Sequence, residues 1–152
     1  GPAYVDNMQR LLKKFDTAKA LVPAPVLRRA ERPARHGVIY YGSTAPAMDE
    51  TLVELAAKGI HVDALRIRSF PFAEAVAEFV RAHDQVFVVE QNRDAQLRTL
   101  LVAEANLDPA KLVPVLHYDG TPVTARAIRL EIESRLTNLR VTPLARNLAS
   151  GE

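Results

Sequence analysis

The segment from Val86 to Leu97 constrains the fold of this chain more than any other part of the sequence. It begins with four apolar residues, three of them β-branched, which run without alternation into Glu90, Gln91 and Asn92. A continuous apolar run of this length is typical of a strand buried on both faces of an α/β sheet. In such sheets, functional groups gather where strands end and loops begin. We therefore expect Glu90, Gln91 and Asn92 to present polar groups to a ligand or a partner.

Strand and helix patterns alternate along the rest of the chain. Apolar runs predict four strands, over residues 38–41, 60–69, 86–89 and 113–116. Pro114 cannot donate a hydrogen bond to a neighbouring strand, so it places the last of these at a sheet edge or a strand start. Apolar residues at helical spacing predict helices that begin near residues 44, 72, 97 and 124. This alternation implies a sheet that lies between two layers of helices.

Three regions are expected along the 152 residues. Residues 1–35 combine a helix over 3–20 with a basic, proline-rich, extended linker over 21–35. Residues 36–138 form the α/β domain, and residues 139–152 form a polar tail. Gly1-Pro2 is typical of the remnant left when a purification tag is cut off, so we expect the chain to derive from a longer protein.

Charge and composition narrow the classes of partner. Residues 1–36 carry eight basic and three acidic residues, whereas the remainder carries 12 basic and 15 acidic residues. A nucleic-acid surface has its basic residues on the folded part, so we expect no nucleic-acid partner. No apolar run approaches about 18 residues, so we expect no membrane-spanning helix. The absence of cysteine excludes disulfides and thiolate metal sites, and it is compatible with the cytoplasmic location that we expect.

Two groups of polar residues are candidate sites. Ser43 and Thr44 follow the first strand and open a helix, where they could cap that helix or line a phosphate site. The surrounding residues match neither a Walker loop nor a dinucleotide fingerprint, so a cap is favoured. Glu90 could act as an acid or base if its pKa were raised, but no second carboxylate or histidine accompanies it. The favoured interpretation is a polar cluster of residues 90–92 that holds loops together or contacts a neighbouring subunit.

The histidines indicate no metal site. No two of them stand four residues apart, so the sequence contains no helical metal-binding pair. Each is interpreted as a solvated or loop histidine, since a lone histidine has no mechanism without a partner. They are His36, His61, His83 and His117. The residues alone therefore predict an α/β domain with a polar strand end and no complete active site.

Four segments carry a family resemblance, and they occur in a fixed order: Gly42-Ser43-Thr44, Leu65 to Phe72, Val88 to Leu97, and Tyr118 to Thr124. From about residue 36 to 132, the chain resembles the C-terminal domain of the α subunit of 2-oxoacid:ferredoxin oxidoreductases. The third segment is similar to the family's Val-Glu-Gln-Asn…Gly-Gln-Leu signature. Residues 4–25 look like the segment that leads into this domain. Ala95 departs from the pattern, because the family has glycine there, and alanine would strain the loop if the position takes a positive φ.

The resemblance implies the fold of the transketolase C-terminal domain, an α/β fold that forms a three-layer α/β/α sandwich with a mostly parallel, mixed sheet. It implies a complete enzyme that oxidatively decarboxylates a 2-oxoacid, expected to be 2-oxoglutarate, with coenzyme A and ferredoxin. Thiamine diphosphate, magnesium and the iron–sulfur cluster would lie in the partner β subunit, and this domain would bind none of them. It would be a non-catalytic structural and assembly module. The candidate interface or ligand-orienting residues are Ser43, Thr44, Glu90, Gln91, Asn92 and Gln96.

Two other functions stay open at this point. The chain could be the equivalent domain of another thiamine enzyme, such as the E1β subunit of a branched-chain dehydrogenase or a transketolase. It could also be a free-standing α/β module that binds an anion at Ser43 and Thr44. The Glu-Gln-Asn…Gln-Leu sequence of residues 90–97 favours the oxidoreductase. Asp119-Gly120 lacks the neighbouring residues of a thiamine diphosphate motif, so we interpret it as a turn.

Overall fold

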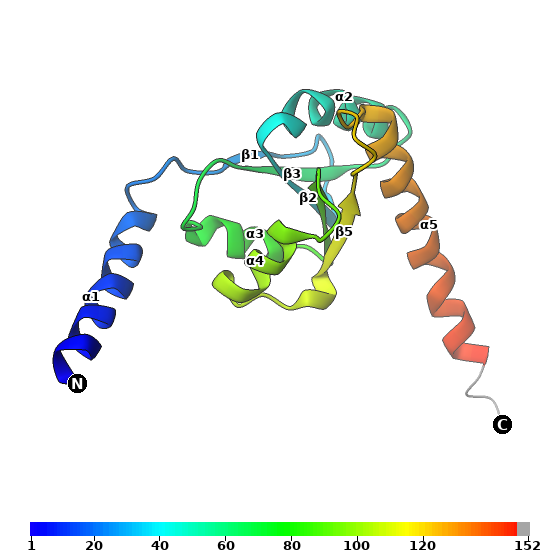
Figure 1. Ribbon diagram of the computed structural model, residues 1–152. Helices are drawn as coiled ribbons and strands as arrows, with labels where there is room; N and C mark the ends of the chain where they lie inside the picture. Colours follow the sequence, from blue (N-terminus) through cyan, green and yellow to red (C-terminus); the bar gives the residue numbers. More distant parts are fainter. Residues whose placement is uncertain (149–152) are drawn as a thin grey trace.

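A five-stranded sheet forms the centre of the molecule, as a computed structural model shows (Figure 1). The structure describes the backbone of residues 1–148 and the side chains of residues 1–138. The strand order is β1-β3-β2-β4-β5. All neighbours pair in parallel except β1, which is antiparallel to β3. The strands are β1 (Val26–Arg28), β2 (His36–Tyr41), β3 (Val62–Ile67), β4 (Gln85–Glu90) and β5 (Leu112–Leu116).

Helices cover both faces of this sheet, which confirms the three-layer α/β/α sandwich with a mostly parallel, mixed sheet (Figure 1). One face packs against α2 and α5, and the other packs against α3 and α4. Short 3₁₀ turns precede α2 and β5. The bounds are α2 (Ala45–Ala57), α3 (Glu74–Ala82), α4 (Gln96–Ala105), α5 (Ala125–Leu148), η1 (Gly42–Thr44) and η2 (Pro109–Lys111).

The position of strand β4 between the two helix layers explains why apolar and polar residues do not alternate in its sequence. Phe87 and Val89 pack with the core beneath α2 and α5, while Val86 and Val88 pack with the core beneath α3 and α4. All four side chains are fully buried. The strand is therefore apolar on both faces, as the sequence predicts, and only its last residue, Glu90, brings a charge into this interior.

Single residues account for several local features of the fold. Gly59 has φ +74° directly after the cap of α2, the left-handed conformation that glycine adopts without strain. Pro114 lies in the edge strand β5. The Thr124 hydroxyl accepts a hydrogen bond from Ala127 N at the start of α5. Gly37 is needed for packing, because a Cβ there would lie 2.7 Å from ring atoms of Phe79.

Three features differ from the sequence expectation. The linker over 21–35 contains β1, whose residues 26–28 pair with residues 64–66 of β3. Strand β3 spans Val62–Ile67 and is shorter than the expected residues 60–69; Arg66 is its only exposed residue, and Asp63 is buried. Helix α5 continues past residue 138 to Leu148, into the segment interpreted as a tail. Residues 149–152 of that tail lie outside the described part of the chain.

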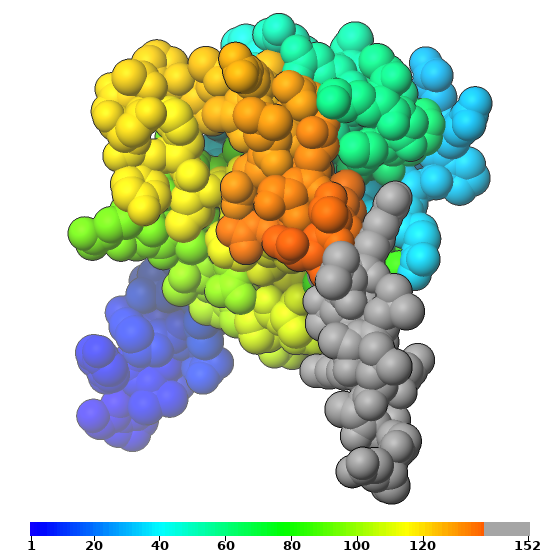
Figure 2. Space-filling view, turned by 90° about the vertical axis from the view of Figure 1, so that its right-hand side faces the viewer, coloured from blue at the N-terminus to red at the C-terminus, as the bar shows by residue number. Residues whose placement is uncertain are grey.

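Helix α1 (Pro2–Lys19) stands away from the sheet (Figure 1). None of its residues is buried. Figure 2 shows its first turns projecting below the folded body, on the side opposite α2. Its last turn lies beside the body, where Asp16, Lys19 and Ala20 line a cleft that also contains residues 70–74. Within residues 1–148, no helix combines the length and the apolar character that crossing a membrane requires.

Candidate functional site

The polar residues singled out by the sequence lie at the carboxyl ends of two adjacent parallel strands. Strand β2 leads into Gly42-Ser43-Thr44, and β4 ends at Glu90 and leads into Gln91 and Asn92. The two strands are neighbours, with Ile39 opposite Val88. The chain continues from β2 to β3 on one side and from β4 to β5 on the other. This is the switch point where open α/β sheets most often place a ligand site.

Glu90 is directed into the protein and not toward this switch point. Its side chain is 0% exposed. Its carboxylate accepts hydrogen bonds from Leu97 N (2.7 Å), Arg98 N (3.0 Å) and Asn92 Nδ2 (2.8 Å). The two amides belong to the first turn of α4, where the helix dipole favours a negative charge. Glu90 therefore holds the start of α4 against the end of β4.

Asn92 completes the same loop through its side-chain oxygen, Oδ1. This atom accepts hydrogen bonds from Asp94 N (3.1 Å) and Gln96 N (3.3 Å). Ala95, which precedes α4, has φ +51° and ψ +48°. The position where the family has glycine thus takes the left-handed conformation, and alanine carries the strain that the sequence comparison anticipates.

Gln91 connects three loops across the switch point. Its Nε2 donates to Ser43 Oγ (3.1 Å) and Thr44 Oγ1 (3.2 Å), and its Oε1 accepts from Val123 N (3.3 Å). The expected cap of α2 by a hydroxyl is wrong, because neither Ser43 nor Thr44 makes a side-chain cap bond. Their hydroxyl oxygens accept from Gln91 instead. The switch point is therefore bridged by the protein's own side chains.

The side chain of Gln96 lies outside these hydrogen bonds, although its backbone N–H binds Asn92, and it lines a groove of about 590 Å³. The groove opens beside the ends of β2 and β3 and the first turn of α4, and its walls are mostly apolar. The side chains of Arg66 and Arg68 also line the groove. Neither side chain forms an ion pair or a hydrogen bond with any residue whose side chain the structure describes. The complete lining is Tyr41, Gly42, Arg66, Ile67, Arg68, Ser69, Phe70, Phe72, Gln96, Leu97 and Leu100.

A second polar cluster lies near the opposite end of the strands, and sequence reasoning missed it. Asp63 accepts hydrogen bonds from Ala30 N (2.9 Å), from the Arg29 guanidinium and from His83 Nε2 (3.2 Å). The other ring nitrogen of His83 lies 2.7 Å from Phe79 O. Burial raises the pKa of Asp63, but the hydrogen bonds from Ala30, Arg29 and His83 outweigh it and hold the pKa below its ordinary value.

His83 lies in the short bend between α3 and β4, as expected of a loop histidine, but it is not solvated. The residue is 3% exposed and packs against the Phe79 ring, with ring centroids 4.4 Å apart. The interpretation is wrong for His36, which lies in strand β2 and not in a loop. An aspartate between apolar residues of a predicted strand was the available signal for this cluster, because a buried carboxylate must find donors.

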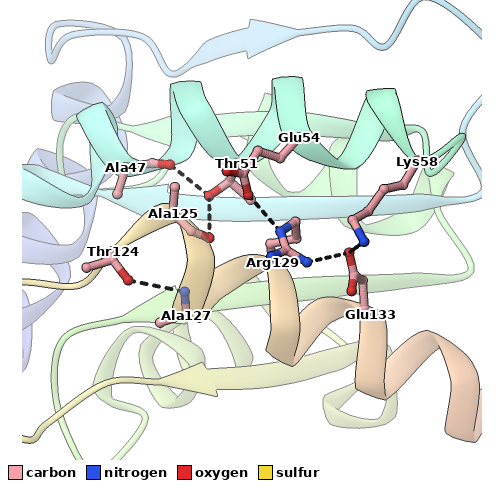
Figure 3. Close-up of polar contacts among 9 residues, drawn as sticks. All are labelled: Ala47, Thr51, Glu54, Lys58, Thr124, Ala125, Ala127, Arg129 and Glu133. Atoms are coloured by element: carbon pink, nitrogen blue, oxygen red, sulfur yellow. Dashed lines mark hydrogen bonds and ion pairs between the residues drawn. The ribbon is translucent and has the colours of Figure 1, made fainter.

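A third network fixes α5 on α2 (Figure 3). Arg129 pairs with Glu54 (2.7 Å) and Glu133 (2.9 Å), and Lys58 approaches Glu133 at 3.4 Å. Hydrogen bonds to Glu133 and Glu54 raise the pKa of Arg129. The Thr51 hydroxyl lies near the carbonyls of Ala47 and Ala125. The contacts lie between the two helices, so the network has a structural role.

The residues with described positions contain no group of three or more histidine, cysteine, aspartate or glutamate side chains that could hold a metal ion.

The sequence matches no family model, and no curated protein matches it by sequence. The structure is similar to a 2-oxoglutarate:ferredoxin oxidoreductase from Magnetococcus marinus, solved with 2-oxoglutarate, coenzyme A and succinyl-CoA bound. The TM-score is 0.76 and the identity 25%, over 88% of this chain and 23% of that chain. This chain thus spans about a quarter of the length of the oxidoreductase chain that it matches.

Two further solved structures share the fold. One is the inactive β4 tetramer of a split-gene transketolase, with a TM-score of 0.60 and 19% identity over 74% of this chain and 41% of that chain. The other is the α chain of a probable 2-oxoacid ferredoxin oxidoreductase from Thermoplasma acidophilum, with a TM-score of 0.51 and 24% identity over 75% of this chain and 97% of that chain. These neighbours confirm the resemblance to the transketolase-like C-terminal domain of such oxidoreductases.

Proposed function

We propose that this chain, which has the fold of the transketolase-like domain of 2-oxoacid:ferredoxin oxidoreductases, is the non-catalytic structural and assembly domain of such an enzyme. The complete enzyme would oxidatively decarboxylate 2-oxoglutarate to its acyl-coenzyme A and pass the electrons to ferredoxin. The observation that carries the proposal is the superposition of 88% of the chain on a 2-oxoglutarate:ferredoxin oxidoreductase.

The bonding at the strand ends supports a structural role over a chemical one. Glu90 is closed off from solvent and satisfied by two amides and an asparagine. Gln91 uses both ends of its side chain to bind other loops. A general acid or base must reach the substrate directly or through one water molecule, and Glu90 has no such path. The cluster instead holds together the loops at the carboxyl ends of β2 and β4.

The division of cofactors between subunits is part of the proposal. We place thiamine diphosphate, magnesium and the iron–sulfur cluster in the partner β subunit. The chain contains no cysteine to bind a cluster, and its described side chains form no group of metal ligands. A reducing cytoplasm, where we place the enzyme, is compatible with that composition.

The exposed polar groups at the strand ends are the proposed contacts with the rest of the enzyme. Ser43, Gln91 and Gln96 are exposed, and Gln96 borders the groove together with Arg66 and Arg68, which form no ion pair among the described side chains. Polar atoms and mostly apolar groove walls are the usual mixture at an interface between domains. Glu90 and Asn92 would act indirectly, by fixing the loop that carries these contacts.

The test uses the complete oxidoreductase that contains this sequence. Gln96→Ala with Ser43→Ala should reduce the fraction of enzyme that assembles, measured by light scattering after size-exclusion chromatography. The assembled fraction should keep its rate of 2-oxoglutarate oxidation with coenzyme A and a viologen acceptor. Glu50→Ala with Glu104→Ala, on exposed positions of α2 and α4, is the matched control and should change neither quantity. An assembled variant with a hundredfold lower rate per thiamine site would instead make these residues catalytic.

A further inference from the structure

Helix α1 exposes more large apolar side chains than any other helix with described side chains. None of its 18 residues is buried. Tyr4, Val5, Leu11, Leu12 and Phe15 are between 38% and 68% exposed. A single exposed leucine needs no explanation, but a contiguous set of this kind marks an interaction surface.

These residues form one stripe, because they recur at helical spacing. The apolar positions are 4, 5, 8, 11, 12 and 15, which corresponds to the steps i, i+1, i+4, i+7, i+8 and i+11. Successive residues are about 100° apart around a helix, so these positions span roughly 120°. This is the width that a helix normally buries against a core. The opposite side of α1 carries Asp6, Arg10, Lys13 and Thr17.

The contacts within α1 are too weak to hold it as a helix in isolation. They are local pairs, Lys19 with Asp16 and Arg10 with Asn7, together with a bond from the Thr17 hydroxyl to Lys13 O. Such pairs contribute little, and an isolated helix of about this length is marginal in water. A stable α1 therefore requires a surface that covers the stripe.

The mostly apolar groove beside the ends of β2 and β3 is not a suitable surface for α1 of a second copy. This groove is bordered by Arg66 and Arg68. Helix α1 carries four basic residues (Arg10, Lys13, Lys14 and Lys19) against Asp6 and Asp16. Like charges would therefore meet if α1 of one copy entered the groove of another, whereas a groove bordered by carboxylates would attract it.

We propose that α1 docks through this stripe into an apolar groove bordered by carboxylates, on the catalytic part of the same oxidoreductase. More than three quarters of the Magnetococcus marinus chain lies outside the region that matches this chain. The corresponding region of a related enzyme is long enough to form such a groove. Of the four basic residues of α1, Lys14 and Lys19 lie nearest the stripe, and they supply the complementary charge. This inference rests on the proposed function. It assigns to α1 the apolar contacts that hold the assembled enzyme together.

The test compares two double variants in the complete enzyme. Leu12→Asp with Phe15→Asp places carboxylates in the stripe, and Gln9→Asp with Thr17→Asp places the same charges outside it. We expect the stripe variant to assemble at least tenfold more weakly by light scattering, and the control to assemble like the parent. Amide hydrogen exchange over residues 2–19 should be slow in the complete enzyme and fast in the 152-residue chain. Thermal unfolding of the 152-residue chain should be the same for parent and variants, since α1 buries nothing there.

Each alternative partner of the stripe predicts a different experimental result. Normal assembly of the stripe variant, together with fast exchange over residues 2–19, would overturn the docking of α1 and leave the proposed function intact. Self-association of the 152-residue chain that the stripe variant abolishes would assign the stripe to a second copy. Binding to vesicles of equal phosphatidylcholine and phosphatidylserine, lost in the stripe variant, would assign it to an anionic membrane surface. If the parent itself fails to assemble with the catalytic part, the proposed function fails as well.

Discussion

The two ends of the parallel strands each hold a buried carboxylate, and the two are satisfied in different ways. Glu90, at the carboxyl end of β4, takes its donors from residues 92, 97 and 98 of the loop and helix that follow it. Asp63, near the amino end of β3, takes its donors from residues 29, 30 and 83, which are at least 20 positions away in the sequence. Glu90 thus fixes a local connection, whereas Asp63 fixes the tertiary arrangement of a linker, a strand and a helix.

Removing Glu90 should have the largest effect of the changes that probe this comparison. Glu90→Ala leaves two amides of α4 and the Asn92 amide without an acceptor, and it opens a cavity. Each buried unsatisfied donor costs about 1–3 kcal/mol, so we expect the free energy of unfolding to fall by about 3–5 kcal/mol. Urea denaturation followed by circular dichroism measures it. Glu90→Gln keeps one oxygen and the shape, and it should lose clearly less; equal losses would show that the cap is not the reason.

Removing Asp63 should have a smaller effect, although it has as many partners. Asp63→Ala leaves His83 buried without its acceptor, but the Arg29 side chain is 62% exposed and can turn to water. We expect a loss of about 2–3 kcal/mol in the same urea experiment. Arg29→Ala should lose under about 1 kcal/mol, as exposed partners do. A loss from Arg29→Ala that equals the loss from Asp63→Ala would mean that the ion pair, and not the buried bonds, carries the stability.

The low pKa of Asp63 predicts how stability depends on pH. Its hydrogen bonds hold the folded pKa below the ordinary value of 3.8. The unfolded chain therefore binds this proton first, and the contribution of Asp63 is complete well above that value and is lost as the pH falls through it. Between about pH 5 and pH 2, the parent should lose stability more steeply than Asp63→Asn. Parallel curves for the two proteins would contradict the shift.

The smallest change in stability is expected at Ala95, where the loop that follows Glu90 is strained. Ala95 has φ +51°, which costs alanine about 1 kcal/mol and costs glycine almost nothing. Glycine also gains freedom in the unfolded chain, so Ala95→Gly should raise the melting temperature only slightly, with a net gain of about 0.5 kcal/mol. Ala95→Val should lower it, since a β-branched side chain fits this conformation worst. A decrease with glycine would mean that the alanine methyl group contributes packing that outweighs the strain.

The same comparison explains which parts of the molecule the sequence could predict. The end of β4 was predictable, because an uninterrupted apolar run and its polar successor lie within a dozen residues. The helix positions and the edge strand with Pro114 were predictable for the same local reason. The Asp63 cluster was not, because its donors come from a linker without a pattern and from a histidine that looks isolated in sequence. Gln91 shows an intermediate case: its position at a strand end was predicted, but its partners at residues 43, 44 and 123 depend on the order of the strands.

The Asp63 cluster also restricts how far α1 can move. Bonds from residues 29 and 30 to Asp63, and from the Ser69 hydroxyl to Pro23 O, tie the linker to the sheet. Only residues 20–22 separate α1 from Pro23, and each spans at most about 3.5 Å, so the end of α1 stays within roughly 15 Å of that point. A partner that holds α1 therefore holds the domain on a short tether. The remaining contacts, at Ser43, Gln91 and Gln96, would then form at the high effective concentration of an intramolecular reaction, and contacts that are weak individually would suffice to fix the orientation of the domain.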